Sequence, residues 1–269
     1  ETLAEVYLKQ HRGIQNPERL QMYYWPVGAK WKALDEQGRL QEKTNHIPAL
    51  LIPAHNEKGE VTGVQRVYLD KRTGNKNTFM DCAKLSKGII QGSGGIIQKG
   101  QKLGIVYLAE GPETAASIAM ANPDATVIVS FGVANFKNLG KLIKQQFPQE
   151  VVIAGDNDLK SKNSAWESTQ KAKEELEKKG LNVKIILPQK LNNKQKTDWN
   201  DVHQQQGIRE LRCQLGLIKT PNKLNDMVIS QNAQTRLEQK QEINHEIKNS
   251  DKQILDISKQ INSEWEIGS

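Results

Sequence analysis

Two short apolar runs, each ending in a carboxylate beside a glycine, constrain this chain more than any other feature. The first run covers residues 104–109 and leads into Glu110. The second covers residues 151–154 and leads into Asp156 and Asp158. Short, continuous apolar runs are typical of strands buried on both faces of a parallel α/β sheet, where ligands bind at the carboxyl ends of the strands. The sequence therefore predicts a parallel sheet with acidic residues along one edge.

Strand and helix patterns alternate around these two runs. Each predicted helix separates two apolar runs, which is the order of a parallel sheet with helices on both faces. We predict strands at 104–109, 126–129, 150–154 and 182–187, and helices at about 112–121, 135–147, 164–179 and 207–215. The chain is therefore expected to have an α/β fold over residues 101–219.

The first 100 residues have a different pattern, which predicts a small α+β unit. Residues 1–20 have an amphipathic helical spacing, and antiparallel strands are expected to follow, with a hairpin turn at 55–59. Residues 70–100 are rich in Lys and Gly. They are interpreted either as a surface that contacts phosphates or as a plain connecting loop.

The last 50 residues are polar, with a narrow helical stripe of isoleucines. For residues 220–269 we predict a helical tail, which is a long helix, a short coiled coil or a linker. From residue 222 onward six Lys and Arg stand against eight Asp and Glu, so the tail is near −2 and the rest of the chain near +9. A basic body favours polyanions such as nucleic acid, although surface lysines that serve solubility explain it equally well.

The two cysteines, Cys82 and Cys213, are far apart and lack metal-type spacing. A disulfide framework and a Cys-rich zinc module are therefore not expected. No apolar run has the length of a membrane span, and no signal peptide opens the chain. We therefore expect a cytoplasmic protein without a membrane partner, as a piece of a longer polypeptide.

The acidic residues are expected to come together, because parallel strands place their carboxyl ends at one edge. Glu110 would then face Asp156 and Asp158, and three carboxylates repel one another unless a cation lies between them. Hard oxygen ligands of this kind suit Mg²⁺. Singly, Glu110 is explained as a helix-start carboxylate and the Asp pair as a turn. Together on one sheet, they favour a site.

These motifs resemble the Toprim domain of topoisomerases, bacterial primases and related nucleases. The resemblance rests on Glu-Gly-x-Glu-Thr-Ala at 110–115, on Asp-x-Asp at 156–158 and on the spacing between them, and it covers about residues 102–203. The likeness is greatest to phage and plasmid primases and to conjugative relaxases with a primase-like portion. In those proteins a motif like Asp-Trp-Asn-Asp at 198–201 follows the last strand.

The resemblance implies Mg²⁺-dependent nucleotidyl transfer, with Mn²⁺ as an alternative metal. It implies that Glu110, Asp156 and Asp158 form a catalytic metal site, which Asp201 joins or orients. Trp199 is expected to be packed rather than stacked on a base. Basic residues near this edge are candidates for contacts to phosphates or template, and exposed charge explains them equally well: Arg66, Lys84, Lys87 and Lys160.

By this resemblance, the first functional hypothesis is a DNA primase that makes short primers on single-stranded DNA in phage or plasmid replication or in conjugative transfer. Its partners would be single-stranded DNA, nucleoside triphosphates and helicase or relaxase portions of a larger polypeptide. One alternative is a Toprim nuclease that uses the same metal for hydrolysis. The other is a nucleic-acid-binding module with an idle metal site.

Overall fold

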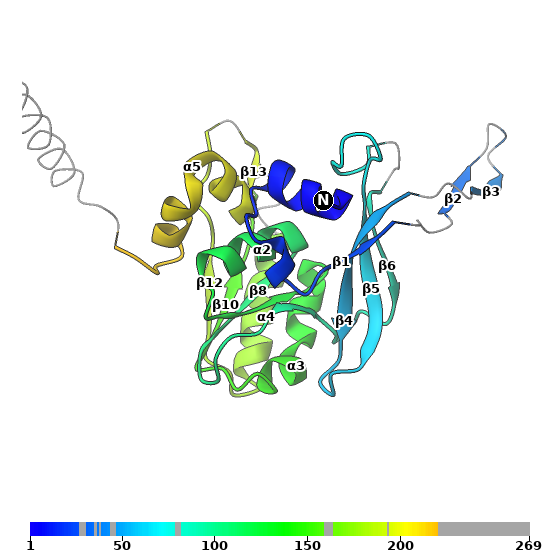
Figure 1. The fold of residues 1–269 in the computed structure, drawn as a ribbon. Coiled ribbons are helices and arrows are strands. Elements are labelled where there is room, and N and C mark those ends of the chain that lie inside the picture. The colour runs from blue at the N-terminus through cyan, green and yellow to red at the C-terminus, as the bar shows by residue number, and fades with distance from the viewer. Residues whose placement is uncertain are drawn as a thin grey trace, which may run out of the picture. The chain divides into compact units, whose positions relative to one another are not determined.

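The fold was analysed in a computed structural model, which describes residues 1–26, 31–34, 37, 39–43, 47–78, 82–158, 164–192 and 194–219. The predicted tail at 220–269 and the candidate Lys160 lie outside the described residues. Residues 1–218 form one compact unit that contains two larger sheets (Figure 1). None of the helices in the described segments has the length and apolar character of a membrane span.

The central sheet has the strand order β12-β10-β8-β9-β7. Four of its strands are parallel, as predicted, and the three inner ones are buried along nearly their whole length. The parallel strands are β8 (Ile105–Ala109), β9 (Thr126–Val129), β10 (Glu150–Ala154) and β12 (Val183–Ile186). The predicted α/β fold with a parallel sheet is confirmed.

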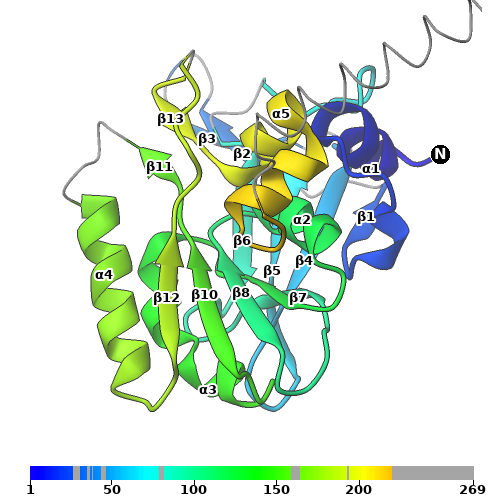
Figure 2. The ribbon, with the colours of Figure 1, turned by 90° about the vertical axis from the view of Figure 1, so that its left-hand side faces the viewer.

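Helices cover both faces of this sheet (Figure 2). Tyr107 and Ala109 belong to one buried cluster, with residues of α2 (Pro112–Ala121) and α5 (Trp199–Gln214). The alternate side chains of β8 belong to a second cluster, with η3 (Val133–Asn138), α3 (Gly140–Lys144) and α4 (Ser164–Glu177). The alternation of side chains along a strand thus gives each face its own core.

Two helix predictions need correction. A single helix was expected at about 135–147, but the chain forms a 3₁₀ turn, η3, followed by the short α3. The last helix was expected at about 207–215, but α5 already begins at Trp199, because Asp198 caps its N-terminus. Gly207, where the sequence suggested a start, is instead a kink inside α5 with a φ of 83°.

The Asp-x-Asp segment is not a simple turn. Asn157–Asp158 forms a short strand, β11, which pairs antiparallel with β13 (Lys196–Thr197). Figure 2 shows β11 and β13 beyond the ends of β10 and β12. This pairing brings the segment before α5 next to the segment after β10.

The N-terminal region contains the antiparallel strands that the sequence predicts. Its sheet has the order β1-β4-β5-β6, and a turn at 56–60 joins β4 to β5. A helical start precedes it: α1 (Leu3–Val6), the π-helical turn η1 (Tyr7–His11) and the 3₁₀ turn η2 (Pro17–Arg19). The strands of the sheet are β1 (Tyr23–Trp25), β4 (Ala49–His55), β5 (Val61–Tyr68) and β6 (Lys84–Gly88), and a separate hairpin consists of β2 (Trp31–Leu34) and β3 (Leu40–Lys43).

The interpretation of residues 70–100 as a loop is wrong for two segments, β6 and β7 (Gly95–Gln98). β7 pairs antiparallel with β9 at the edge of the central sheet. A Cβ atom on Gly95 would lie 2.6 Å from the Ile52 side chain of β4, so only glycine allows the two sheets to approach here. The predicted domain boundary at residue 100 stays a prediction, although β7 belongs to the central sheet.

Candidate active site

A pocket of about 270 Å³ lies where β8 and β10 end. Gln65 and Lys84 lie on β5 and β6 of the N-terminal sheet, and Glu110 and Asp156 follow β8 and β10 of the central sheet. The remaining charged residues of the pocket wall lie on α2, on β13 and at the start of α5: Glu113, Lys196 and Asp198. Four carboxylates and two ammonium groups line it: Glu110, Glu113, Asp156, Asp198, Lys84 and Lys196. The pocket therefore combines opposite charges in a small volume.

Asp156 is one of the two predicted catalytic carboxylates that line the pocket. Its Oδ2 atom accepts a hydrogen bond from Lys196 Nζ at 2.9 Å, and its side chain is only 13% exposed. Its Oδ1 atom is buried and has no hydrogen-bond partner among the residues that the structure describes. Burial raises the pKa of Asp156, and the Glu110 carboxylate adds to this, whereas the Lys196 ammonium acts against it.

Glu110 and Asp158 lie differently with respect to this aspartate. Glu110 follows β8 and lines the same pocket as Asp156. Asp158 is half-buried on β11, directly opposite Lys196 in the strand pairing. In the described part of the chain, no three His, Cys, Asp or Glu side chains group closely enough to hold a metal ion. The structure thus brings Glu110 and Asp156 into one pocket, and the three-carboxylate metal site stays a prediction.

The donor chemistry of the pocket nevertheless fits a divalent cation. The unpartnered Oδ1 atom of Asp156 is a hard oxygen donor, and an unpaired buried carboxylate oxygen is costly unless a cation or donor reaches it. The Glu110 carboxylate lines the same cavity. Carboxylate oxygens with room for water are what Mg²⁺ and Mn²⁺ accept. Glu110 and Asp156 are therefore the residues that would hold such an ion.

Glu113 lines the pocket, although the sequence indicated it only as part of the motif at 110–115. Its Oε1 atom accepts a hydrogen bond from the Tyr7 hydroxyl at 2.7 Å, and its Oε2 atom accepts one from Lys84 Nζ at 2.6 Å. Burial by itself would raise the pKa of Glu113, but Lys84 and these hydrogen bonds outweigh it and lower the pKa to about 2. Glu113 thus ties η1, β6 and α2 together.

The motif at 198–201 places one aspartate in the pocket and the other outside it. Asp198 caps α5: its side chain accepts from the Asp201 N–H at 2.8 Å, and Asp201 in turn accepts from the Asp198 N–H at 3.1 Å. Asp198 lines the pocket, whereas Asp201 pairs with Lys194. Burial, followed by the charge of Asp201, raises the pKa of Asp198 to about 6. Trp199 is fully buried and donates to the Gly155 carbonyl at 3.1 Å, as expected for a packed residue.

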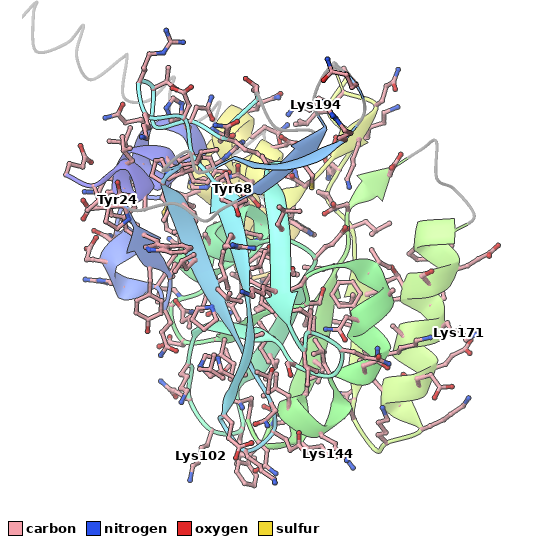
Figure 3. The ribbon with its side chains drawn as sticks, turned by 90° about the vertical axis from the view of Figure 1, so that its right-hand side faces the viewer. Tyr24, Tyr68, Lys102, Lys144, Lys171 and Lys194 are labelled. Atoms are coloured by element: carbon pink, nitrogen blue, oxygen red, sulfur yellow. The ribbon has the colours of Figure 1, made fainter. Side chains whose placement is uncertain are left out.

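The basic residues predicted to contact phosphates or template lie on two opposite faces of the N-terminal sheet. Lys84 pairs in register with Val67 and lines the pocket, as does Gln65. Arg66 and Lys87 occupy the alternate positions of β5 and β6, so they lie on the opposite face of that sheet. The Arg66 guanidinium there lies over the Tyr68 ring, 5.6 Å from its centroid. Figure 3 shows Tyr68 on the side of this sheet that faces away from the central sheet.

Lys196 is a charged pocket residue that was not predicted from the sequence. It stands two positions before Asp198, in the segment leading to the recognised motif. Its place beside Asp156 depends on the pairing of β11 with β13, which joins segments far apart in the chain. Proximity to the motif was the only signal in the sequence that could have indicated it.

Comparison with known protein families places these residues in context. The Toprim domain model matches residues 105–209, and a domain of unknown function, DUF7146, matches residues 1–97. Residues 105–209 of the chain therefore match the Toprim domain, which confirms the predicted resemblance. None of the curated proteins matches the chain.

Solved structures with a similar fold include primases. A DNA primase domain from Pseudomonas aeruginosa has a TM-score of 0.50 and 11% identity, over 77% of this chain and 69% of that chain. The primase fragment of the bacteriophage T7 primase-helicase protein has a TM-score of 0.46 and 15% identity, over 77% and 72%. The Aquifex aeolicus primase, in its zinc-binding and RNA polymerase domains, has a TM-score of 0.44 and 16% identity, over 69% and 43%. At 11% identity, the likeness to the Pseudomonas aeruginosa domain concerns the fold alone.

Proposed function

We propose that this chain is a Mg²⁺-dependent nucleotidyltransferase of the DNA primase type, which makes short primers on single-stranded DNA. One observation carries the proposal: the carboxylates of Glu110 and Asp156 line one pocket together with the ammonium groups of Lys84 and Lys196. Nucleotidyl transfer needs this combination, because carboxylates hold the metal and cations offset the charge of the triphosphate. The Toprim domain supports a role in nucleic-acid processing.

In this mechanism Glu110 and Asp156 would hold the divalent cation, which, when bound, supplies Lewis-acid stabilisation of the reacting phosphates. Lys84 is positioned by Glu113, so its ammonium stays at the pocket wall. Lys84 and Lys196 would bind the triphosphate oxygens and orient the nucleotide toward the 3′-hydroxyl of the primer. Asp198 fixes the start of α5 at the same wall.

The proposed partners at this pocket are single-stranded DNA and nucleoside triphosphates. The body of the chain, residues 1–221, carries a net charge near +9, which favours a nucleic-acid backbone. We propose that the chain acts in phage or plasmid replication or in conjugative transfer, beside helicase or relaxase portions of a larger polypeptide.

The test is incorporation of a labelled nucleotide into short products on single-stranded DNA, with and without Mg²⁺. Glu110→Gln preserves the size of the side chain and removes its charge, and we expect the yield of products to fall by roughly 100-fold or more. Glu175→Gln is the matched control, because Glu175 lies on α4 in a surface pair with Lys178 at 2.8 Å. We expect this control to leave the yield unchanged.

Two other outcomes would contradict the proposal. Template degradation that requires Mg²⁺ and Glu110, without nucleotide incorporation, would indicate a nuclease. Template binding that neither Mg²⁺ nor Glu110→Gln changes, without products or degradation, would indicate a nucleic-acid-binding module.

A further inference from the structure

Lys196 reaches the pocket from a well-anchored backbone. β13 pairs with β11, with Lys196 opposite Asp158 and Thr197 opposite Asn157. Thr197 is fully buried, and its Oγ1 atom accepts a hydrogen bond from the Leu191 N–H at 3.1 Å. The side chain of Lys196, in contrast, is 49% exposed. The backbone is therefore fixed at this point, while the long side chain has room to move.

The ammonium group of Lys196 lies among the carboxylates predicted to bind the metal. Its Nζ atom is 2.9 Å from Asp156 Oδ2, and it also interacts electrostatically with Glu110 and Asp158. One ammonium satisfies only half of Asp156, because the buried Oδ1 atom has no hydrogen-bond partner in the described segments. Lys196 therefore supplies a single positive charge where the carboxylates can accept a doubly charged ion.

The second lysine of the pocket is held in a different way. Lys84 Nζ lies 2.6 Å from Glu113 Oε2, and its side chain is 28% exposed. The other oxygen of Glu113 is already satisfied by Tyr7. Both oxygens of Glu113 therefore have a partner. We expect Lys84 to stay paired with Glu113 when a cation binds in the pocket.

We propose that Lys196 is a cationic placeholder, which neutralises Asp156 in the metal-free chain and is displaced when a divalent cation binds. The inference rests on the metal site of the proposed function. An ammonium 2.9 Å from Asp156 and a metal ion on the same carboxylate would repel each other strongly at such short range. The flexible stem of lysine allows the ammonium to leave, and the released group stays near enough to bind a phosphate of the nucleotide.

The first test measures Mn²⁺ affinity of the full chain by electron paramagnetic resonance, without nucleotide. We expect Lys196→Met to bind Mn²⁺ about tenfold more tightly than the unaltered protein, because it removes a competing like charge. Lys196→Arg, which keeps the charge, should restore the weaker affinity. Lys194→Met is the matched control, because Lys194 pairs with Asp201 outside the pocket, and it should leave the affinity unchanged.

Lys84→Met separates displacement from a general effect of charge. Lys84 lines the same pocket but contacts Glu113 instead of Asp156. We expect its change in Mn²⁺ affinity to be clearly smaller than that of Lys196→Met. An equal or larger change would overturn the placeholder role.

The second test needs no variant and follows Lys196 itself. An amine-acylating reagent is applied with and without saturating Mn²⁺, and the modification of each lysine is measured by mass spectrometry. We expect Lys196 to react several-fold faster once the metal has released it, with Lys194 unchanged as the internal reference. Unchanged reaction of Lys196 in a protein that binds Mn²⁺ would overturn the inference and leave the metal site standing. Absence of Mn²⁺ binding in every variant would overturn both.

Discussion

The pocket contains two ion pairs between a lysine and a carboxylate, one on each side. They differ in whether both oxygens of the carboxylate have a partner. On the side of the N-terminal sheet, both carboxylate oxygens of Glu113 are satisfied, by Lys84 and by Tyr7. At the edge of the central sheet, Lys196 satisfies one oxygen of Asp156, and the other is buried without a partner among the described residues. A completed pair stabilises the fold, whereas an incomplete one leaves an acceptor for a ligand.

The largest expected effect on stability separates the two pairs directly. We expect Glu113→Gln to lower the free energy of unfolding by about 2 kcal/mol, because it leaves the Lys84 ammonium without its partner in a partly buried place. Asp156→Asn should change this free energy by less than about 1 kcal/mol, since it removes a buried charge that is only half satisfied. Denaturant unfolding followed by circular dichroism at pH 7 measures both, and equal losses would contradict the distinction.

The pH dependence of stability provides a second comparison. Asp198 has a pKa of about 6 in the folded protein, against an ordinary value of 3.8, so the folded state binds more protons between these pH values. The free energy of unfolding should therefore fall as the pH rises from about 4 to about 6, by an amount on the order of 2 kcal/mol. Asp198→Asn keeps an N-cap acceptor and should reduce this dependence in denaturant titrations across that range.

Glu113 should act in the opposite sense. Its pKa is lowered from 4.5 to about 2, so the stability it contributes is complete above about pH 4.5 and is lost as the pH falls toward 2. In Asp198→Asn, the remaining loss of stability on acidification should occur below about pH 4.5. A loss confined to higher pH would contradict the lowered pKa of Glu113.

A smaller effect than that of Glu113→Gln concerns the hydrogen bond between Tyr7 and Glu113. We expect Tyr7→Phe to lower the free energy of unfolding by about 1 kcal/mol, because it leaves one buried carboxylate oxygen of Glu113 unsatisfied. Tyr68→Phe is the control: the Tyr68 hydroxyl is buried and has no hydrogen-bond partner among the described residues. Thermal unfolding of both variants should show a loss for Tyr7→Phe alone.

The sequence predicted the elements whose patterns are local. Strands such as residues 104–109 and 150–154 are continuous apolar runs, and α2 has a proline at its start, so each could be found within its own segment. β7 was missed because its short apolar run follows glycines that suggest a loop, although close packing against Ile52 requires the glycine at 95.

The candidate site was predicted where it depends on strand ends and missed where it depends on pairing between distant segments. Glu110 and Asp156 follow β8 and β10, so the parallel sheet alone brings them to one edge. Lys196 reaches Asp156 only through the two-residue strands β11 and β13, which have no pattern long enough to detect. In the motif at 198–201, Asp198 and Asp201 bond reciprocally at the start of α5, and of these two only Asp198 lines the pocket.

We propose that the ion pair at the edge of the central sheet, between Asp156 and Lys196, is the catalytic one. The most direct measurement is Mg²⁺-dependent primer synthesis on single-stranded DNA by Asp156→Asn and Glu113→Gln, at a temperature at which both remain folded. We expect Asp156→Asn to make no primers while its stability stays near that of the unaltered protein. We expect Glu113→Gln still to make primers despite its lower stability. Primer synthesis by Asp156→Asn at a rate near that of the unaltered protein would contradict the claim.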